Sequence, residues 1–190
     1  FVKRYGMRAG NIVGTGAFVP SYTSPDADGL TPDATPFWMV GGAGVEIEVD
    51  TETGHIKIER LVNVCDVGTP INPAIVETQI SGGAVMQLGF TMFEEMTFDE
   101  GQLTNGTLAD YRIPGFHDLP ESMTSETVEA VQRSGPFGAK GVGESPNVGG
   151  VPAFSNAVHD AFRAFGLRHS HMPHDHWRIW KVAHELGLHG

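Results

Sequence analysis

Two alternating segments separated by a turn stand out in residues 44–62, GVEIEVDTETGHIKIERLV. Apolar and polar residues alternate in 45–50 and again in 55–62, which is the pattern of half-buried β-strands. The intervening residues 51–54 end on glycine and predict a tight turn. We therefore predict a β-hairpin whose second strand continues toward Asp66.

A helix is predicted downstream of this hairpin. Asn72 is a favoured N-cap residue and Pro73 a favoured first residue of a helix. Two adjacent glycines, Gly82 and Gly83, interrupt the apolar pattern that follows, and each costs about 1 kcal/mol in a helix interior relative to alanine. We expect another backbone or a ligand to approach the helix closely at that point.

The remaining elements make the fold class α+β. Farther along, we predict a short hairpin around 99–101, a strand over 125–131, a glycine-rich loop over 135–150, an amphipathic helix over 151–165 and a last helix after the N-cap Asp175. Residues 1–40 are rich in Gly, Pro, Ser, Thr and Asp, and 17–22 are considered as a short strand. We expect them to form an irregular arm packed on a partner chain, and 41–190 to form one domain.

Composition excludes several classes of protein. The 190 residues carry a formal charge of −11, which argues against DNA or RNA as the main partner. With 25 glycines and 12 prolines a long helical bundle is not expected, and the single Cys65 cannot form an internal disulfide. No apolar run is long enough to span a membrane. With its lone cysteine the protein is expected in the cytoplasm.

The densest chemical signal is residues 138–146, GAKGVGESP. Its glycines would let the backbone approach a bulky ligand, Lys140 adds a positive charge, and Glu144 precedes a proline that stiffens the chain. A carboxylate projected from such a loop toward a water-poor pocket can act as a general base. The loop is neither a Walker loop nor a Rossmann fingerprint. From spacing alone, a plain surface loop with a solvated glutamate is the more common case.

Four histidines near the end of the chain invite a metal-site interpretation. They are His169, His171, His174 and His176. No set of Cys, Asp or Glu stands with them at ligand spacing, and no HExxH motif occurs. We therefore predict a solvated or interface tail and no metal held by protein side chains.

Several blocks of the chain, taken in order, resemble one family. The blocks are 44–50 with 53–54 (GVEIEVD, TG), 66–68 with 71–74 (DVG, INPA), 79–89 (QISGGAVMQLG), 111–114 (YRIP) and 138–144 (GAKGVGE). Over about residues 36–166 the chain looks like the C-terminal part of the molybdopterin-binding catalytic subunit of the xanthine oxidase family, the molybdenum hydroxylases. The order of the blocks is more specific than any one block. The resemblance implies the α+β fold of the second molybdopterin-binding domain of these enzymes.

The resemblance also implies a chemistry. In that family a molybdopterin, often the cytosine dinucleotide in bacteria, holds molybdenum with oxo, sulfido and hydroxyl ligands. A glutamate matching Glu144 takes the proton from Mo–OH, oxygen from water is added to an electron-poor carbon of an N-heterocycle or aldehyde, and hydride passes to the sulfido ligand. Electrons then leave through 2Fe–2S clusters, commonly to FAD, on other domains or subunits.

By the same match, Glu144 is expected to be catalytic. The residues expected to bind the cofactor are Gln79, Gly82, Gly83, Lys140, Gly141, Val142 and Gly143. Lys140 is equally well interpreted as a structural ion-pair partner. Gly82 and Gly83 would let their helix approach the pterin.

The resemblance leaves part of the family's catalytic subunit unmatched. Its preceding portion, with further cofactor and substrate contacts, has no counterpart in these 190 residues, as expected for a naturally split subunit or for a fragment. Activity would therefore need partner chains: one carrying the first half of the molybdenum subunit, an iron–sulfur subunit and a flavin subunit. The alternatives are a non-catalytic assembly subunit, and the carbon monoxide dehydrogenase or thioester reductase branches of the family. A further alternative is an anion-binding domain for an unrelated nucleotide.

Overall fold

The structure, a computed structural model, describes residues 13–167 and 171–188, and the chain divides into two compact units, Phe1–Pro36 and Phe37–Gly190. The described part of the first unit contains no helix or strand, so the strand considered over 17–22 is not formed. Asp26 organises a loop there, because its Oδ1 accepts hydrogen bonds from the N–H groups of Asp28 and Leu30. The packing of this unit on a partner chain stays a prediction.

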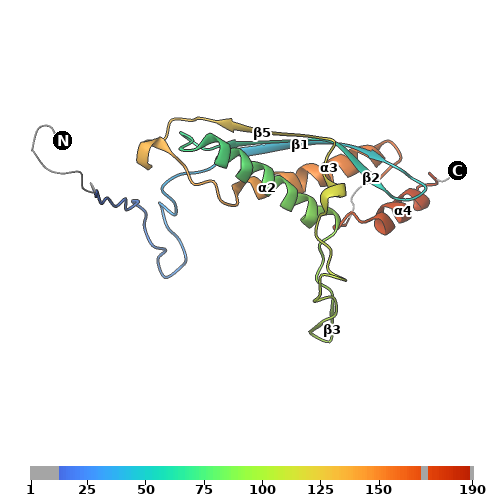
Figure 1. Cartoon of the computed structure of the whole chain (residues 1–190). Helices are drawn as coiled ribbons and strands as arrows, with labels where there is room; N and C mark the ends of the chain where they lie inside the picture. Colours follow the sequence, from blue (N-terminus) through green and yellow to red (C-terminus); the bar gives the residue numbers. More distant parts are fainter. Residues whose placement is uncertain (1–12, 168–170, 189–190) are drawn as a thin grey trace, which may run out of the picture. The chain divides into compact units, whose positions relative to one another are not determined.

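The second unit is built on a three-stranded sheet with the order β1-β2-β5 (Figure 1). The predicted hairpin is confirmed: β1 (Gly41–Val49) pairs antiparallel with β2 (Ile56–Asp66). The third strand, β5 (Ser122–Val128), runs parallel to β2 and confirms the strand predicted near 125–131, although it begins and ends three residues earlier. Together with the helices, this sheet confirms the α+β class.

A β-bulge in the hairpin changes which residues of β2 face the core. Glu46 pairs with Arg60 but Ile47 pairs with Ile58, so Glu59 has no partner on β1. Before the bulge the even positions are buried, and after it the odd positions are, beginning with Leu61. One extra residue on one strand reverses the inward and outward faces. As a result Asn63 and Cys65 face inward and are almost fully buried.

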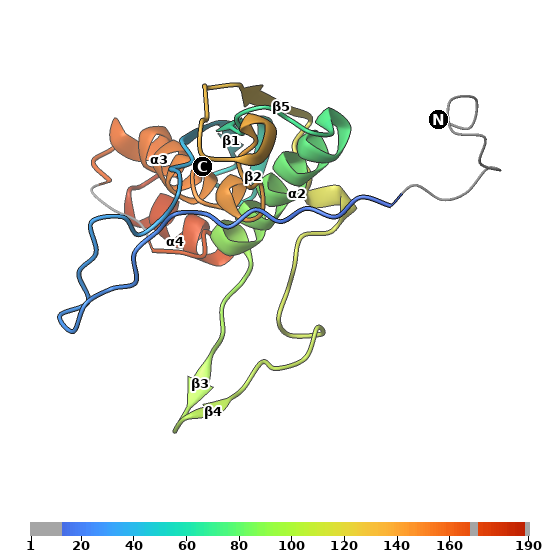
Figure 2. The ribbon, with the colours of Figure 1, turned by 90° about the vertical axis from the view of Figure 1, so that its left-hand side faces the viewer.

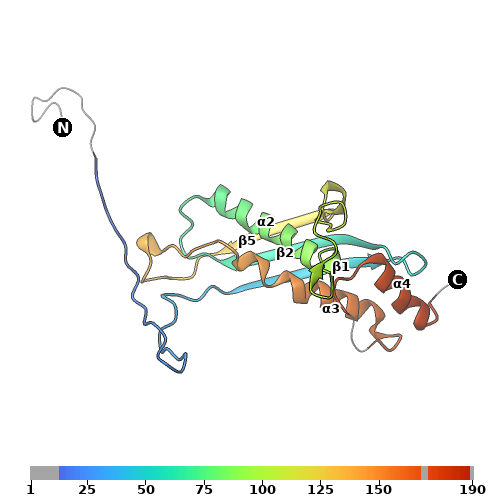
Figure 3. The ribbon, with the colours of Figure 1, turned by 90° about the horizontal axis from the view of Figure 1, so that it is seen from below.

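Two helices, α2 (Pro73–Met92) and α3 (Gly150–Arg163), lie side by side on one face of the sheet (Figures 1 and 3). The predicted start of α2 is confirmed, because the Asn72 side chain accepts a hydrogen bond from the Ile75 N–H and Pro73 is the first helical residue. The main core lies between the sheet and the helices, where the buried apolar side chains include Ile58, Leu61, Leu88, Phe154, Phe162 and Ile179. A smaller cluster of Cys65, Val67 and Ile80 continues it toward the start of α2.

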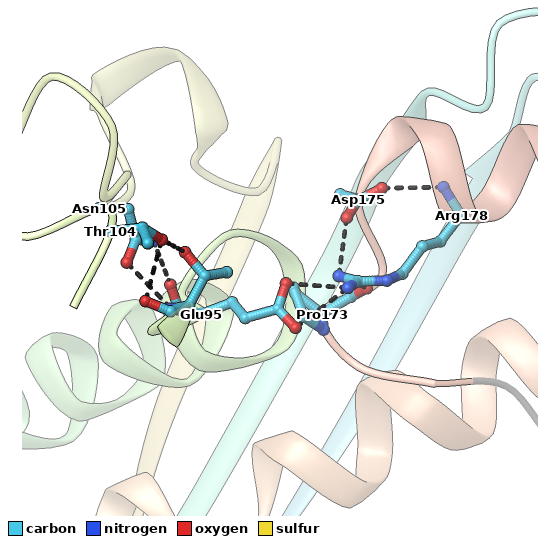
Figure 4. A network of polar contacts seen from close by, with 7 residues as sticks. Glu95, Thr104, Asn105, Pro173, Asp175 and Arg178 are labelled. Atoms are coloured by element: carbon cyan, nitrogen blue, oxygen red, sulfur yellow. Dashed lines mark hydrogen bonds and ion pairs between the residues drawn. The ribbon is translucent and has the colours of Figure 1, made fainter. Parts of the chain in front are cut away.

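The last helix, α4 (His176–Glu185), begins after the predicted N-cap, since the Asp175 side chain accepts from the Arg178 N–H. Arg178 makes ion pairs with Asp175 and with Glu95 (Figure 4). Glu95 lies at the base of a two-stranded ribbon, β3 (Phe98–Asp99) and β4 (Gln102–Leu103), which projects away from the sheet and helices (Figure 2). The ribbon is the predicted short hairpin, and Arg178 fixes its base to α4.

The histidine-rich tail was predicted to be solvated or at an interface, and for His174 this is wrong. Its side chain is 1% exposed, its Nε2 lies 3.1 Å from Ser155 Oγ, and burial lowers the pKa of the ring. The segment from His174 into α4 packs against the body, which takes this ring out of water. His169 lies outside the described residues. In the described chain no helix has both the length and the apolar character that crossing a membrane requires.

Candidate functional site

The glycine-rich loop predicted to carry the chemistry is held against the end of β2. An isolated antiparallel bridge joins Gly68 to Ala139, and the Lys140 N–H donates to the Val67 carbonyl at 2.9 Å. Gly68 has a φ of +59°, and a Cβ there would overlap the carbonyl oxygen of Gly138. Only glycine therefore permits this close crossing of the two segments. These contacts fix the residues at the start of the loop to the end of β2.

Lys140 forms the ion pair that one of its two interpretations predicted. Its Nζ lies 2.6 Å from Asp66 Oδ2 and 2.8 Å from the carbonyl oxygen of Trp38, and both side chains of the pair are about nine-tenths buried. Burial of the Asp66 carboxyl acts to raise its pKa, but hydrogen bonds from Lys140 and from the Gly68 N–H outweigh this and lower it. Lys140 thus fixes the loop to the end of β2, and direct binding of a cofactor by this side chain stays a prediction.

Gln79 fixes the next part of the loop to α2. Its Nε2 donates to the Val142 carbonyl oxygen at 3.1 Å, and the Gln79 side chain is otherwise exposed. The amide was predicted to face the cofactor. The structure places it beside the loop, and its contact with a cofactor is a prediction that no observation here tests.

Glu144 follows directly and is exposed. It precedes a single 3-10 turn, η3 (Ser145–Asn147), in which Pro146 is buried. Beside it, Gly143 has open space where a Cβ would stand. The sequence predicted a water-poor pocket around this carboxylate. Within the described chain the Glu144 side chain is exposed, so the water-poor pocket stays a prediction that a cofactor and a partner chain would complete.

The two adjacent glycines of α2 have different surroundings. A Cβ on Gly83 would lie 2.6 Å from Pro146 Cβ and 2.5 Å from Asn147 Oδ1, so the close approach expected here is made by η3 of the same chain. A Cβ on Gly82 would meet no atom within 4 Å. Of the pair, Gly82 is the one whose open side remains available for a ligand.

Two buried amides that sequence analysis missed also contact this loop. Asn63 and Gln87, 2% and 0% exposed, both donate to the carbonyl oxygen of Pro146. A signal for Gln87 was present, because it lies three and seven residues after Ala84 and Ile80 on the buried stripe of α2. No sequence signal marked Asn63, whose orientation depends on the bulge.

Small hollows flank the loop on both sides. One of about 240 Å³ includes Gly42, Asn63, Cys65, Ser145 and Gly149 in its lining, and one of about 230 Å³ lies between the start of α2 and Lys140. A larger hollow of about 850 Å³ around α4 shares no lining residue with either. Size alone therefore does not locate the site in the part of the chain described.

The loop fits a large polar cofactor. In the described chain, the N–H groups of Gly141, Val142 and Gly143 donate to no protein acceptor, and the faces of Gly82 and Gly143 are open. Consecutive unpaired N–H groups beside side-chain-free glycines suit the polar edge or phosphates of a pterin. No group of three His, Cys, Asp or Glu side chains in the described residues is placed to hold a metal ion.

Fold and site together define an α+β domain that presents one exposed carboxylate from a loop fixed to β2 and α2. Comparison with known proteins is more specific. Residues 2–120 match the family model of the molybdopterin cofactor-binding domain. The chain is therefore a member of the xanthine oxidase family of molybdenum enzymes and corresponds to the C-terminal part of the molybdopterin-binding subunit.

Individual relatives agree with the family model. The chain is 44% identical over 144 residues to the carbon monoxide dehydrogenase large chain of Afipia carboxidovorans, covering 75% of this chain and 18% of that protein. It is 38% identical over 134 residues to the nicotine 6-hydroxylase large subunit of Paenarthrobacter nicotinovorans, and the match covers 69% of this chain and 16% of that protein. The solved carbon monoxide dehydrogenase of Oligotropha carboxidovorans superposes with a TM-score of 0.76 at 39% identity, covering 84% of this chain and 20% of that one. The chain thus spans less than a fifth of the length of these curated relatives.

Proposed function

We propose that this chain is part of the catalytic subunit of a molybdenum hydroxylase and supplies its general base, Glu144. The substrate would be oxidised at an electron-poor carbon of an N-heterocycle or aldehyde, with oxygen taken from water. A bound molybdenum cofactor would supply an activated oxygen nucleophile and accept the electron pair of the substrate. Within the chain, Glu144 would accept the proton that the nucleophile loses.

The observation that carries this proposal is the way the carboxylate is presented. Glu144 is exposed, yet the loop on either side of it is fixed to buried groups, by Lys140 on Asp66 before it and by Pro146 on Asn63 and Gln87 after it. A solvated surface glutamate needs no such support. A general base does, because proton transfer demands a defined position within hydrogen-bond reach of the reacting group.

The open side of the loop supports cofactor binding. The cofactor would contact the N–H groups of Gly141, Val142 and Gly143 and the bare face of Gly82, with Gln79 and Lys140 holding the loop in place. Gly83 would contribute by letting η3 approach α2. We further propose a molybdopterin in the cytosine dinucleotide form, with 2Fe–2S clusters and FAD on partner subunits and the first half of the molybdenum subunit on another chain or segment.

A second candidate is oxidation of carbon monoxide. Two relatives named as carbon monoxide dehydrogenase large chains are 44% and 42% identical to this chain, against 38% for the nicotine 6-hydroxylase large subunit. Turnover assays of the assembled complex with carbon monoxide, an N-heterocycle and an aldehyde, each with an artificial electron acceptor, distinguish the two candidates.

The test of the base is Glu144→Gln in the assembled complex. The amide keeps the size of the side chain but cannot accept the proton, so we expect kcat to fall by about 100-fold or more. Molybdenum and pterin content should stay at the wild-type level, because Glu144 is not proposed to hold the cofactor. Metal analysis and turnover on the same preparation provide both measurements.

Glu48→Gln is the matched control, since Glu48 is an exposed glutamate on β1. It should leave kcat unchanged. Wild-type turnover in Glu144→Gln would reject the assignment of the base. A complex that binds a nucleotide but no molybdenum would reject the cofactor and favour an anion-binding domain instead.

A further inference from the structure

A single carbonyl group, that of Pro146, fixes the chain just after the proposed base. Asn63 Nδ2 donates to this oxygen at 2.9 Å from β2, and Gln87 Nε2 donates to it from α2. The donors lie 83 and 59 residues away from Pro146 in sequence. A carbonyl oxygen has two lone pairs, so the two amides use its full accepting capacity.

Two glycines make this arrangement sterically possible. A Cβ on Gly83 would push against the Pro146 ring, and a Cβ on Gly150, at the start of α3, would overlap Gln87 Oε1. The amides, the carbonyl and both glycines therefore form one packed unit between β2, α2 and α3. We call Asn63, Gln87 and the Pro146 carbonyl the Pro146 clamp.

The clamp places polar side chains in the core, where apolar ones would make the fold more stable. Asn63 and Gln87 are at least 98% buried, and Gln87 Oε1 has no hydrogen-bond partner in the described chain. A buried amide that is not fully hydrogen-bonded makes the fold less stable than an apolar side chain of the same shape would. The two amides instead fix the position and orientation of the Pro146 carbonyl, because a hydrogen bond has a preferred distance and angle and apolar packing has neither.

We propose that Asn63 and Gln87 are positioning residues that set the place of Glu144. The inference rests on the proposed function for its catalytic part alone. The Pro146 ring restricts the backbone between the clamped carbonyl and Glu144, so a displaced carbonyl displaces the carboxylate. On the other side of Glu144, Gln79 holds the Val142 carbonyl and Lys140 holds the loop to Asp66.

The test uses Asn63→Leu and Gln87→Met in the assembled complex, because each removes the donor and nearly keeps the volume. Within 144–148, the amides of Asn147 and Val148 donate to the carbonyls of Glu144 and Ser145, and their hydrogen exchange should accelerate about tenfold, the effect of losing one hydrogen bond. kcat should fall about tenfold or more with KM nearly unchanged, since small misplacements of a reacting group are expensive. Molybdenum and pterin content should stay at the wild-type level.

Asn105→Leu is the matched control for these variants. Asn105 Nδ2 also donates to a backbone carbonyl, that of Glu95, but at the base of the β3–β4 ribbon (Figure 4). This substitution should change neither the exchange of 144–148 nor kcat. If Asn63→Leu or Gln87→Met does not fold, Gly83→Ala displaces Pro146 without removing a donor and should give the same pattern.

Combination with Glu144→Gln separates positioning from general damage. If the clamp acts through Glu144, adding Gln87→Met to Glu144→Gln should lower the residual kcat no further, while the exchange effect persists. An equal further loss of kcat, or unchanged exchange in both clamp variants, would overturn the proposal. If Glu144→Gln itself keeps full activity, the proposed function fails, and the exchange measurement still decides whether the clamp holds the loop.

Discussion

At the scale of single residues, the site depends on a few buried polar contacts that cross long sequence distances. The pair of Asp66 and Lys140 is the clearest of these, because both side chains are about nine-tenths buried and meet at 2.6 Å. Such a pair is costly to break, since removing one partner leaves the other charge buried and unpaired. It ties the loop of Glu144 to the end of β2.

The lowered pKa of Asp66 predicts how this contact depends on pH. A carboxyl whose pKa is lower in the folded than in the unfolded state stabilises the fold above its ordinary value of 3.8. That contribution is lost as the pH falls below 3.8 toward the lowered pKa. We expect Asp66→Asn to reduce the free energy of unfolding by about 3 kcal/mol at pH 7. Urea unfolding of both proteins should show this difference shrinking below pH 4, and a constant difference would contradict the prediction.

At the scale of elements, the position of α4 depends on the turn between β1 and β2. Gly54 has a φ of +74°, and a Cβ there would overlap the His176 carbonyl oxygen and lie 2.7 Å from the Trp180 backbone nitrogen. The first turn of α4 therefore lies directly against this glycine. Next to this glycine, the rings of His55 and His176 pack edge to face, with their centroids 5.1 Å apart. The turn that closes the hairpin is thus also the surface on which α4 lies.

Gly54→Ala should accordingly displace α4. Conformational strain and the overlap together should cost about 3 kcal/mol or more. Gly101→Ala is the control, because Gly101 has a φ of +83° but open space around it, and it should cost about 1 kcal/mol. Thermal unfolding measures both costs, and tryptophan fluorescence reports α4, which carries Trp177 and Trp180. Equal costs for the two variants would show that α4 does not contact the turn.

At the scale of the whole molecule, many large apolar side chains are exposed. Phe137, Phe116 and Trp38 are 88%, 84% and 77% exposed, and others lie on α2 and in the loops near the site. Exposed apolar surface on this scale is typical of a protein that packs against another body. The chain spans less than a fifth of the length of its curated relatives. We propose that this surface packs against the chain or segment that would carry the first half of the molybdenum subunit.

The chain on its own should therefore bind an apolar dye. We expect anilinonaphthalene sulfonate fluorescence per mole of chain to be several-fold higher for the isolated chain than for the assembled complex, because assembly covers the apolar side chains. The chain unfolded in denaturant is the control, since it lacks organised apolar surface and should bind little dye. Equal dye binding by the isolated chain and the complex would contradict this prediction.

The local elements of the second unit follow from signals in the sequence. The alternating residues of 45–50 and 55–62 form the expected hairpin. The expected helices begin after the N-caps Asn72 and Asp175. These signals act between residues that are near neighbours in sequence. The loop of Glu144 was also located from its composition and from family resemblance. The surroundings that would enclose Glu144 stay a prediction, since this residue is exposed within the described chain.

The amino-acid sequence by itself determined the hairpin of 45–62, the starts of α2 and α4 and the close approach at Gly83, since periodicity, capping and backbone freedom are local properties. Only the tertiary structure decided which partners those residues meet. Glu59 is left out of the pairing with β1, which turns Asn63 inward, and packing of α2 brings Gln87 to the same carbonyl. Contacts between residues 59 and 83 positions apart depend on how whole elements pack, and no local pattern encodes that distance.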